Sequence, residues 1–244
     1  MLINADFSRR AELTAEQHQW VKSPQNGVER VMLDRVGAEK ARATSLVRYA
    51  PNSHFPRHLH PGGEEILVLS GTFSADDKHY SAGWYLRNPP ASGHTPYSDE
   101  GAVIFVKLRQ MRPSENRHVA IVTHDSANWQ RVGNREVCAL FSDDSEQVSL
   151  QRLSAGDRLF TKDLMTQTVA GGAELLVVKG TLIEGTLIED TLVEGAQTYT
   201  QNSWIRWPVG TQSQITAGTK GATVYLKTGH LAHVIGADVE GLDV

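Results

Sequence analysis

The sequence predicts an all-β protein built from two copies of one domain. Apolar residues occur in short runs of strand length, such as residues 46–49, 66–69 and 103–108, and none shows the longer 3.6-residue period of a helix. Turn signals such as Pro61-Gly62-Gly63 separate these runs at short intervals. The same succession of runs and turns occurs twice along the chain. These three observations predict a sandwich or a barrel of antiparallel strands.

One segment near the start departs from this pattern. In residues 8–19, Ser8 can cap a helix, and Glu12 and Glu16 follow at helical spacing. We expect a single short helix there and strands elsewhere.

The internal repeat decides the number of domains. Glu65 and the seven residues after it recur from Glu174, an offset of 174 − 65 = 109, whereas Tyr85 recurs as Trp204, an offset of 119. Three segments of the first copy find partners in the second, namely residues 65–72 with 174–181, 85–89 with 204–208, and 102–107 with 222–227. With the polar stretch 112–116 as the link, the predicted domains are residues 1–115 and 116–244.

The difference of ten residues between the two offsets has a visible origin. Three successive pentapeptides of similar sequence begin at Thr181, Thr186 and Thr191, and two extra units account for the ten. We expect an elongated hairpin or an irregular excursion there, without chemistry of its own.

Composition excludes several classes of partner. The chain has 244 residues, 24 Lys and Arg and 28 Asp and Glu, so its net charge of −4 offers no cationic surplus for nucleic acid or an anionic membrane. Cys138 is the single cysteine and cannot form an intramolecular disulfide. No signal peptide and no apolar stretch long enough to cross a membrane occurs. We expect a cytoplasmic protein that binds neither nucleic acid nor membranes.

The histidines, ten in all, point to chemistry. His58 and His60 are two residues apart, so on a strand both rings lie on one face. A Pro-Gly-Gly turn follows, and Glu64 begins the next strand. His94 follows the Pro89-Pro90 turn and can complete the set from a third strand or its loop. Three imidazoles and one carboxylate suit a divalent ion such as Zn, Fe, Mn, Ni or Cu and leave positions open for a small molecule.

Glu65 competes with Glu64 for the carboxylate role. Strand alternation and the six residues between Glu64 and Gly71 favour Glu64. The predicted site therefore consists of His58, His60, Glu64 and His94.

The second copy serves as an internal control. No histidine occurs between His124 and His230, and the repeat places Ala173 at the position of Glu64 and Ser213 at that of His94. The second domain therefore cannot form this metal site. Three charged positions persist in both copies and are interpreted as structural, in salt bridges on outward faces or at a shared interface: Glu65 and Glu174, Arg87 and Arg206, Lys107 and Lys227.

The remaining histidines and the cysteine carry weaker signals. His54 precedes His58 by four residues and lies either in the pocket or at its rim. His79 is expected in a solvated hairpin turn. His230 and His233 have helical spacing but no evident carboxylate partner, so they are interpreted as surface residues. Cys138 is expected to be a small core residue rather than a nucleophile.

The run from His58 to Gly71, together with Gly83, Pro89 and His94, resembles the two motifs of the cupins. Residues 44–51, 85–90 and 104–107 resemble more closely the ChrR-like cupins, the metal-binding type found as the C-terminal domain of the anti-sigma factor ChrR. The resemblance extends over nearly the whole chain as a bicupin with a degenerate second copy. It implies two jelly-roll barrels and one metal held by His58, His60, Glu64 and His94.

Full anti-sigma factors of this type carry an additional N-terminal zinc-binding helical domain. The first 20 residues contain one histidine and no cysteine, so we do not expect direct binding of a sigma factor.

Two functional hypotheses follow from the predicted site. The first is a metal-binding sensor or small-molecule-binding protein with one divalent ion, Zn or Fe before Mn or Ni, in the N-terminal barrel. The alternative is an Fe(II)-dependent dioxygenase that cleaves a diketone or hydroxyketone, as related cupins do. Both need the same four ligands, so the sequence leaves open whether the protein is an enzyme. The two barrels and their edge strands also predict a homodimer.

Overall fold

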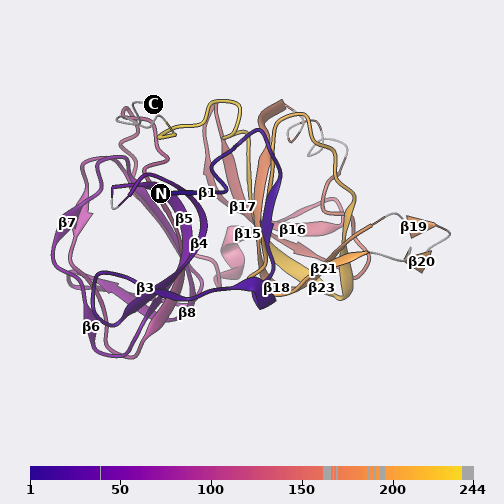
Figure 1. The fold of residues 1–244 in the computed structure, drawn as a ribbon. Helices are drawn as coiled ribbons and strands as arrows, with labels where there is room; N and C mark the ends of the chain where they lie inside the picture. Colours follow the sequence, from indigo (N-terminus) through magenta and orange to yellow (C-terminus); the bar gives the residue numbers. More distant parts are fainter. Residues whose placement is uncertain are drawn as a thin grey trace. The chain divides into compact units, whose positions relative to one another are not determined.

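The computed structural model of the chain confirms an all-β fold (Figure 1). Described residues are 1–38, 40–161, 166, 168, 170–185, 187–188, 191–192 and 196–237. Two large antiparallel sheet systems account for most of the strands, as the sequence predicts. No described helix is long and apolar enough to cross a membrane.

The chain forms two compact units. Unit 1 contains residues 1–5, residues 19–124 and the described end of the chain from residue 234, and unit 2 contains residues 6–18 and 125–233. The predicted domains, 1–115 and 116–244, differ from these units in short segments at both ends of each copy.

Unit 1 is a barrel-like sheet system whose main strand order is β1-β4-β5-β13-β8-β10-β14. Further short strands pair with β4 and β8, and β7 pairs with β11. The strands of unit 1 are β1 (Leu2–Ile3), β3 (Val21–Lys22), β4 (Val28–Val36), β5 (Arg42–Tyr49), β6 (Ser53–His54), β7 (His58–Leu59), β8 (Glu64–Ala75), β9 (Lys78–Ser81), β10 (Trp84–Asn88), β11 (Gly93–His94), β12 (Pro96–Ser98), β13 (Ala102–Leu108) and β14 (Val119–Val122).

Unit 2 repeats this arrangement with the order β15-β16-β17-β23-β18-β22-β2. Its strands are β2 (Ala11–Leu13), β15 (Trp129–Val132), β16 (Arg135–Ser142), β17 (Gln147–Leu153), β18 (Ala173–Glu184), β19 (Leu187–Ile188), β20 (Thr191–Leu192), β21 (Gln197–Tyr199), β22 (Trp204–Trp207) and β23 (Ile215–Thr228), and the 3₁₀ helix η2 (Ser126–Asn128) precedes β15.

The pairing register confirms the internal repeat residue by residue. In unit 1, Glu65 lies opposite Arg87 on one side and Lys107 on the other. Glu174 has the equivalent neighbours in unit 2, Arg206 and Lys227. The offsets found in the sequence therefore join structurally equivalent positions.

Each unit takes its edge strand from the chain segment that precedes the other copy. β2 pairs with β22, with Leu13 opposite Trp204, and β14 pairs with β10. The helix expected over residues 8–19 is therefore wrong. That segment forms β2 and a single 3₁₀ turn, η1 (Ala15–Gln17), because pairing with β22 outweighs a weak local preference for helix.

The pentapeptide region extends a hairpin, in agreement with the expectation from the sequence. β18 continues to Glu184 and pairs with β21, and β19 pairs with β20 further out. Residues 186, 189–190 and 193–195 of the repeats lie outside the described residues.

Candidate metal centre

Four predicted side chains of unit 1 lie close together. His58 and His94 face each other on the paired strands β7 and β11, and Glu64 begins β8. His60 lies between β7 and β8. One ligand atom from each of His58, His60, Glu64 and His94 falls within 4.8 Å of all the others. Among the described residues, this is the one group of three or more His, Cys, Asp or Glu side chains that could hold a metal ion.

A tight turn brings His60 and Glu64 together. Gly63 has a φ of +77° and donates its N–H to the His60 carbonyl at 3.2 Å. An added Cβ at Gly63 would lie 2.4 Å from Met111 Sδ. The left-handed backbone conformation therefore favours glycine there, and an added Cβ would also displace the Met111 side chain. The turn places Glu64 beside the two imidazoles.

Hydrogen bonds at Nδ1 orient two of the histidine rings. His58 Nδ1 lies 3.1 Å from the Pro56 carbonyl, which can only accept, so this nitrogen carries the proton. Ser92 donates its hydroxyl proton to the Pro89 carbonyl at 2.6 Å, and its oxygen then accepts from His60 Nδ1 at 3.2 Å. Nε2 is then the nitrogen of each ring that is available to a metal ion.

Glu64 is held by Asn88 and faces two imidazoles. Asn88 Nδ2 donates to Glu64 Oε2 at 3.1 Å. The same oxygen lies 3.4 Å from His60 Nε2 and 3.6 Å from His94 Nε2. Both nitrogens are buried without a hydrogen-bond partner, which costs free energy unless something binds them.

The electrostatics of the group match a cation. Burial, together with the neighbouring histidines, lowers the pKa of His60 to about 3 and that of His94 to about 4, so both rings are neutral at pH 7. Burial raises the pKa of Glu64 to about 7, against the opposing effect of Asn88. Neutral imidazoles, one buried carboxyl group and two unpartnered nitrogens therefore fit a divalent ion.

A cavity of about 540 Å³ opens beside these four side chains. Its apolar wall comes from alternate residues of β5 and β13, including Val47, Tyr49, Ile104 and Val106. That volume lies in the usual range for sites that take small molecules.

Glu65 has a separate role from Glu64, as strand alternation predicts. Its carboxylate lies 3.1 Å from Arg87 Nη1. The ion pair is buried, as are Lys107 and the equivalent Glu174, Arg206 and Lys227, all at most 3% exposed. The salt-bridge interpretation is thus correct for Glu65. Burial excludes solvent-exposed positions for these residues, and the alternative that they lie at a shared interface stays a prediction.

The other histidines and the cysteine lie outside the group. His54 is exposed and stacks on Tyr97 with ring centroids 5.6 Å apart, and His79 is exposed. His230, expected at the surface without a carboxylate, instead has a side chain only 6% exposed, with Nε2 3.2 Å from Glu174. Cys138 is fully buried, and burial raises the pKa of its thiol.

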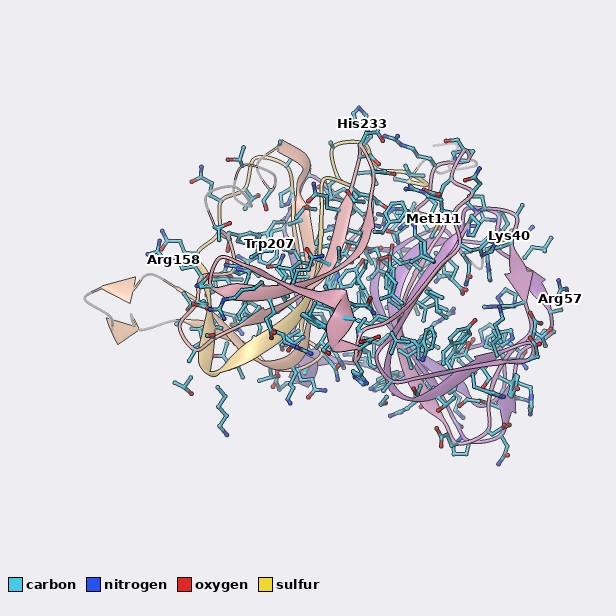
Figure 2. The ribbon with its side chains drawn as sticks, turned by 180° about the vertical axis from the view of Figure 1, so that it is seen from behind. Lys40, Arg57, Met111, Arg158, Trp207 and His233 are labelled. Atoms are coloured by element: carbon cyan, nitrogen blue, oxygen red, sulfur yellow. The ribbon has the colours of Figure 1, made fainter. Side chains whose placement is uncertain are left out.

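Unit 2 fills the equivalent position with core residues. Ala173 stands where Glu64 stands in unit 1, and it pairs with Trp207 as Glu64 pairs with Asn88. Both are fully buried in the apolar core of the unit, and Trp207 is labelled in Figure 2. Ser213, the counterpart of His94, donates to Glu184.

Sequence reasoning missed the two supporting residues of unit 1, Asn88 and Ser92. Neither belongs to a charged or periodic pattern. Asn88 precedes the Pro89-Pro90 turn, and only its pairing opposite Glu64 reveals its contact with the carboxylate.

Comparisons with known proteins agree with the fold and with the first copy. The family described as the ChrR cupin-like domain matches residues 8–112. No curated protein matches the sequence significantly.

Several solved structures share the fold at low sequence identity. A candidate dioxygenase from Nostoc punctiforme is 12% identical, with a TM-score of 0.65 over 97% of this chain and 85% of that one. A bacterial pirin from Escherichia coli in complex with nickel(II) is also 12% identical, with a TM-score of 0.64 over 90% of this chain and 98% of that one. A Pseudomonas aeruginosa protein described as glyoxylate-induced is 14% identical, with a TM-score of 0.65 over 100% of this chain and 94% of that one.

Proposed function

Residues 8–112 belong to the ChrR cupin-like family within a bicupin fold, and from this premise we propose that unit 1 binds one divalent metal ion and uses it to hold a small molecule. The ligands in this proposal are His58, His60, Glu64 and His94. Zinc or iron is proposed before manganese or nickel.

The observation that carries the proposal is the pair of unpartnered nitrogens beside a carboxylate. His60 Nε2 and His94 Nε2 are buried without hydrogen-bond partners, and both point at Glu64 Oε2. A divalent ion among them would replace the missing interactions of all three groups. It would supply a Lewis acid and a binding position for an oxygen of the small molecule.

The residues around the ion prepare the site for this role. Ser92 and Pro56 fix the rings of His60 and His58, and Asn88 holds Glu64. The cavity of about 540 Å³ gives a small molecule access to the side of His58 that remains partly exposed. Binding of a metal and binding of a ligand are therefore supported by adjacent groups of one unit.

Metal analysis of the purified protein tests the proposal. We expect one equivalent of metal per chain in the wild type and a loss of most of it in His60→Ala, with the barrel still folded. The matched control is His54→Ala, because His54 is exposed and stacks on Tyr97 outside the group. Stoichiometric metal retained by His60→Ala would refute the ligand assignment.

A second candidate function is an Fe(II)-dependent dioxygenase that cleaves a diketone or hydroxyketone. The cavity beside a three-histidine, one-carboxylate group favours it, because such a site has room for a substrate and oxygen. Oxygen uptake by anaerobically purified, iron-loaded protein with β-diketones and hydroxyketones separates the two candidates. Substrate-dependent uptake supports the dioxygenase, whereas tightly bound zinc without uptake supports the sensor or binding protein.

A further inference from the structure

The cavity beside the proposed metal site is lined by basic side chains. Among the described residues that line it, Arg30, Arg35, Lys40 and Arg109 are cationic, and Glu64 is the one acidic residue. Lys40 is exposed and is labelled in Figure 2, whereas Arg35 is only 4% exposed. The lining of the cavity therefore carries more positively than negatively charged groups.

A β-bulge in β4 directs Arg35 into the cavity. Met32 lies opposite Ser45, but Asp34 lies opposite Thr44, so Leu33 is an extra residue without a partner. Because side chains alternate along a strand, the extra residue reverses the alternation after it. Arg35 therefore shares the inner face with Arg30.

The reversed alternation also accounts for Asp34. This side chain is turned from the cavity and lies 3.1 Å from Arg42 in a buried ion pair.

Arg35 lies on the same cross-strand row as Glu64. The register runs from Arg35 to Ala43, from Ala43 to Leu108 and from Leu108 to Glu64. Three strand spacings make this row about 14 Å long, and the curvature of the sheet shortens the path through the cavity. A molecule of several heavy atoms can therefore contact the proposed metal and the guanidinium together.

Arg109 lies beside the turn that precedes Glu64. It directly follows β13, and its backbone N–H donates to the Gly63 carbonyl at 3.0 Å, in the turn that precedes Glu64. The basic residues thus come from β4, from the loop after it and from the end of β13.

Unit 2 shows that the barrel does not need these cations to fold. Its strand β16 has the same bulge, with Leu140 as the extra residue. Counting along the matched registers, Val137, Ser142 and Gly229 replace Arg30, Arg35 and Arg109.

The pattern of loss separates two kinds of charge. The buried charges shared by both copies, exemplified by Glu65 and Glu174, persist, whereas the three arginines disappear together with the metal-site residues. Charged residues needed for the common fold are thus present in both units. The charged residues around the cavity are absent from unit 2, where the metal-site residues are also absent.

We infer that the cavity of unit 1 takes a small organic oxoanion, a carboxylate or a phosphate, held by Arg30 and Arg35 with another of its oxygens directed to the metal. This inference rests on the proposed function and names its ligand class. Guanidinium groups bind both oxoanions through paired hydrogen bonds. A neutral molecule of the same size would not form these paired hydrogen bonds with the guanidinium groups.

Calorimetric titration of the full chain loaded with one equivalent of Zn(II) tests the inference. The probes are succinate and L-malate as carboxylates, inorganic phosphate and glycerol 3-phosphate as phosphates, and dimethyl succinate as the neutral counterpart. We expect at least one anion to bind at least tenfold more tightly than the neutral ester, and the preferred anion identifies the source of the oxoanion. Arg30→Gln and Arg35→Gln are each expected to weaken that binding about tenfold.

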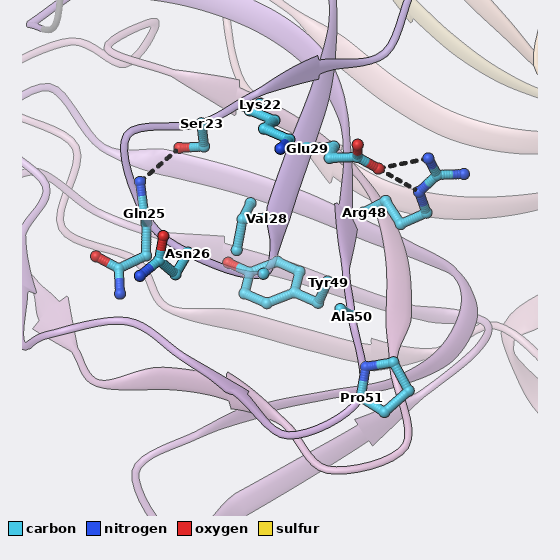
Figure 3. A pocket seen from close by; sticks show the side chains of 11 residues that line it. Lys22, Ser23, Gln25, Asn26, Val28, Glu29, Arg48, Tyr49, Ala50 and Pro51 are labelled. Atoms are coloured by element: carbon cyan, nitrogen blue, oxygen red, sulfur yellow. Dashed lines mark hydrogen bonds and ion pairs between the residues drawn. The ribbon is translucent and has the colours of Figure 1, made fainter.

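The matched control is Arg48→Gln, on the neighbouring strand β5. Arg48 is exposed and pairs with Glu29 in a different hollow, of about 450 Å³ (Figure 3). This variant is expected to bind the anion as the wild type does. Arg35 donates to the Ala38 carbonyl, so Arg30→Gln provides the test if Arg35→Gln does not fold.

The outcomes distinguish this inference from the proposed function. Equal binding of the anions and the neutral ester, or unchanged binding by both arginine variants, overturns the inference even if one metal is bound. If the wild type binds no metal, the same titration of metal-free protein still tests the arginines, and arginine-dependent anion binding then supports this inference while the metal proposal fails.

Discussion

The hydroxyl of Ser92 accepts a hydrogen bond from His60 Nδ1, at 3.2 Å, because its own proton is donated to the Pro89 carbonyl. This relationship fixes the protonation of an imidazole from a turn 32 residues away in the chain. Ser92→Ala should therefore weaken metal binding about 10- to 100-fold, the usual effect of removing a partner of a metal-binding histidine. Competition with a chelator measures the affinity.

Ser81→Ala is the matched control, since Ser81 is exposed at the end of β9. Ser92 also stabilises its own turn through its hydrogen bond to the Pro89 carbonyl, so thermal unfolding of the metal-free variant should be recorded. An unchanged metal affinity in Ser92→Ala would show that the hydroxyl does not orient His60.

Neighbouring carboxylates Glu64 and Glu65 should give opposite phenotypes. Glu64→Gln is expected to lose metal, because the amide removes the anionic ligand oxygen. Glu65→Gln is expected to keep metal but lower the free energy of unfolding by about 3 to 5 kcal/mol, because it breaks a buried ion pair with Arg87. Metal analysis and urea unfolding of both variants measure the two effects, and metal loss in Glu65→Gln alone would reverse the assignment.

Strand β2, which precedes the first copy in the sequence but pairs with β22, should contribute to the stability of unit 2. A fragment of residues 125–233 lacks β2, which leaves the β22 edge unpaired and removes Arg10, a partner of Glu184. We expect this fragment to aggregate or to unfold at lower urea concentration than the same fragment preceded by residues 6–18 through a flexible linker. Light scattering and circular dichroism make the comparison, and equal behaviour of the two fragments would contradict it.

Cys138 should be unreactive in the folded protein. Its side chain is fully buried and the pKa of its thiol is raised by burial, so little thiolate is accessible at pH 8. A colorimetric thiol assay should find no fast-reacting thiol in native protein and one in urea. Ser154→Cys, at an exposed site of the same unit, supplies a reactive reference thiol, and a Cys138 that reacts as fast as this reference would argue against the expected burial.

Homodimer formation stays a prediction from the sequence. Light scattering after size exclusion should give twice the mass of one chain over a range of protein concentrations. A constant mass of one chain would refute it.

Much of the fold and of the site was accessible from the sequence because the information was local or repeated. Strand alternation distinguishes Glu64 from Glu65, and the repeat by itself aligns Ala173 with Glu64, as the strand pairing confirms. The predicted helix at residues 8–19 was wrong. Local preferences in a short segment cannot show that it pairs with β22, a strand nearly 200 residues away. The buried His230–Glu174 contact was missed for the same reason, because its two residues are 56 positions apart.

The sequence by itself determined the all-β class, the duplication and the four residues of the candidate metal group. Each of these depends on the spacing of residues within a short segment, or on a segment that occurs twice in the chain. Tertiary structure alone decided which strands each unit takes from outside its own repeat, which small residues hold the imidazoles, and that Arg35 enters the cavity. The physical reason is that these features depend on long-range pairing and on one extra residue, Leu33, whose effect on the direction of later side chains appears only when the partner strand is known.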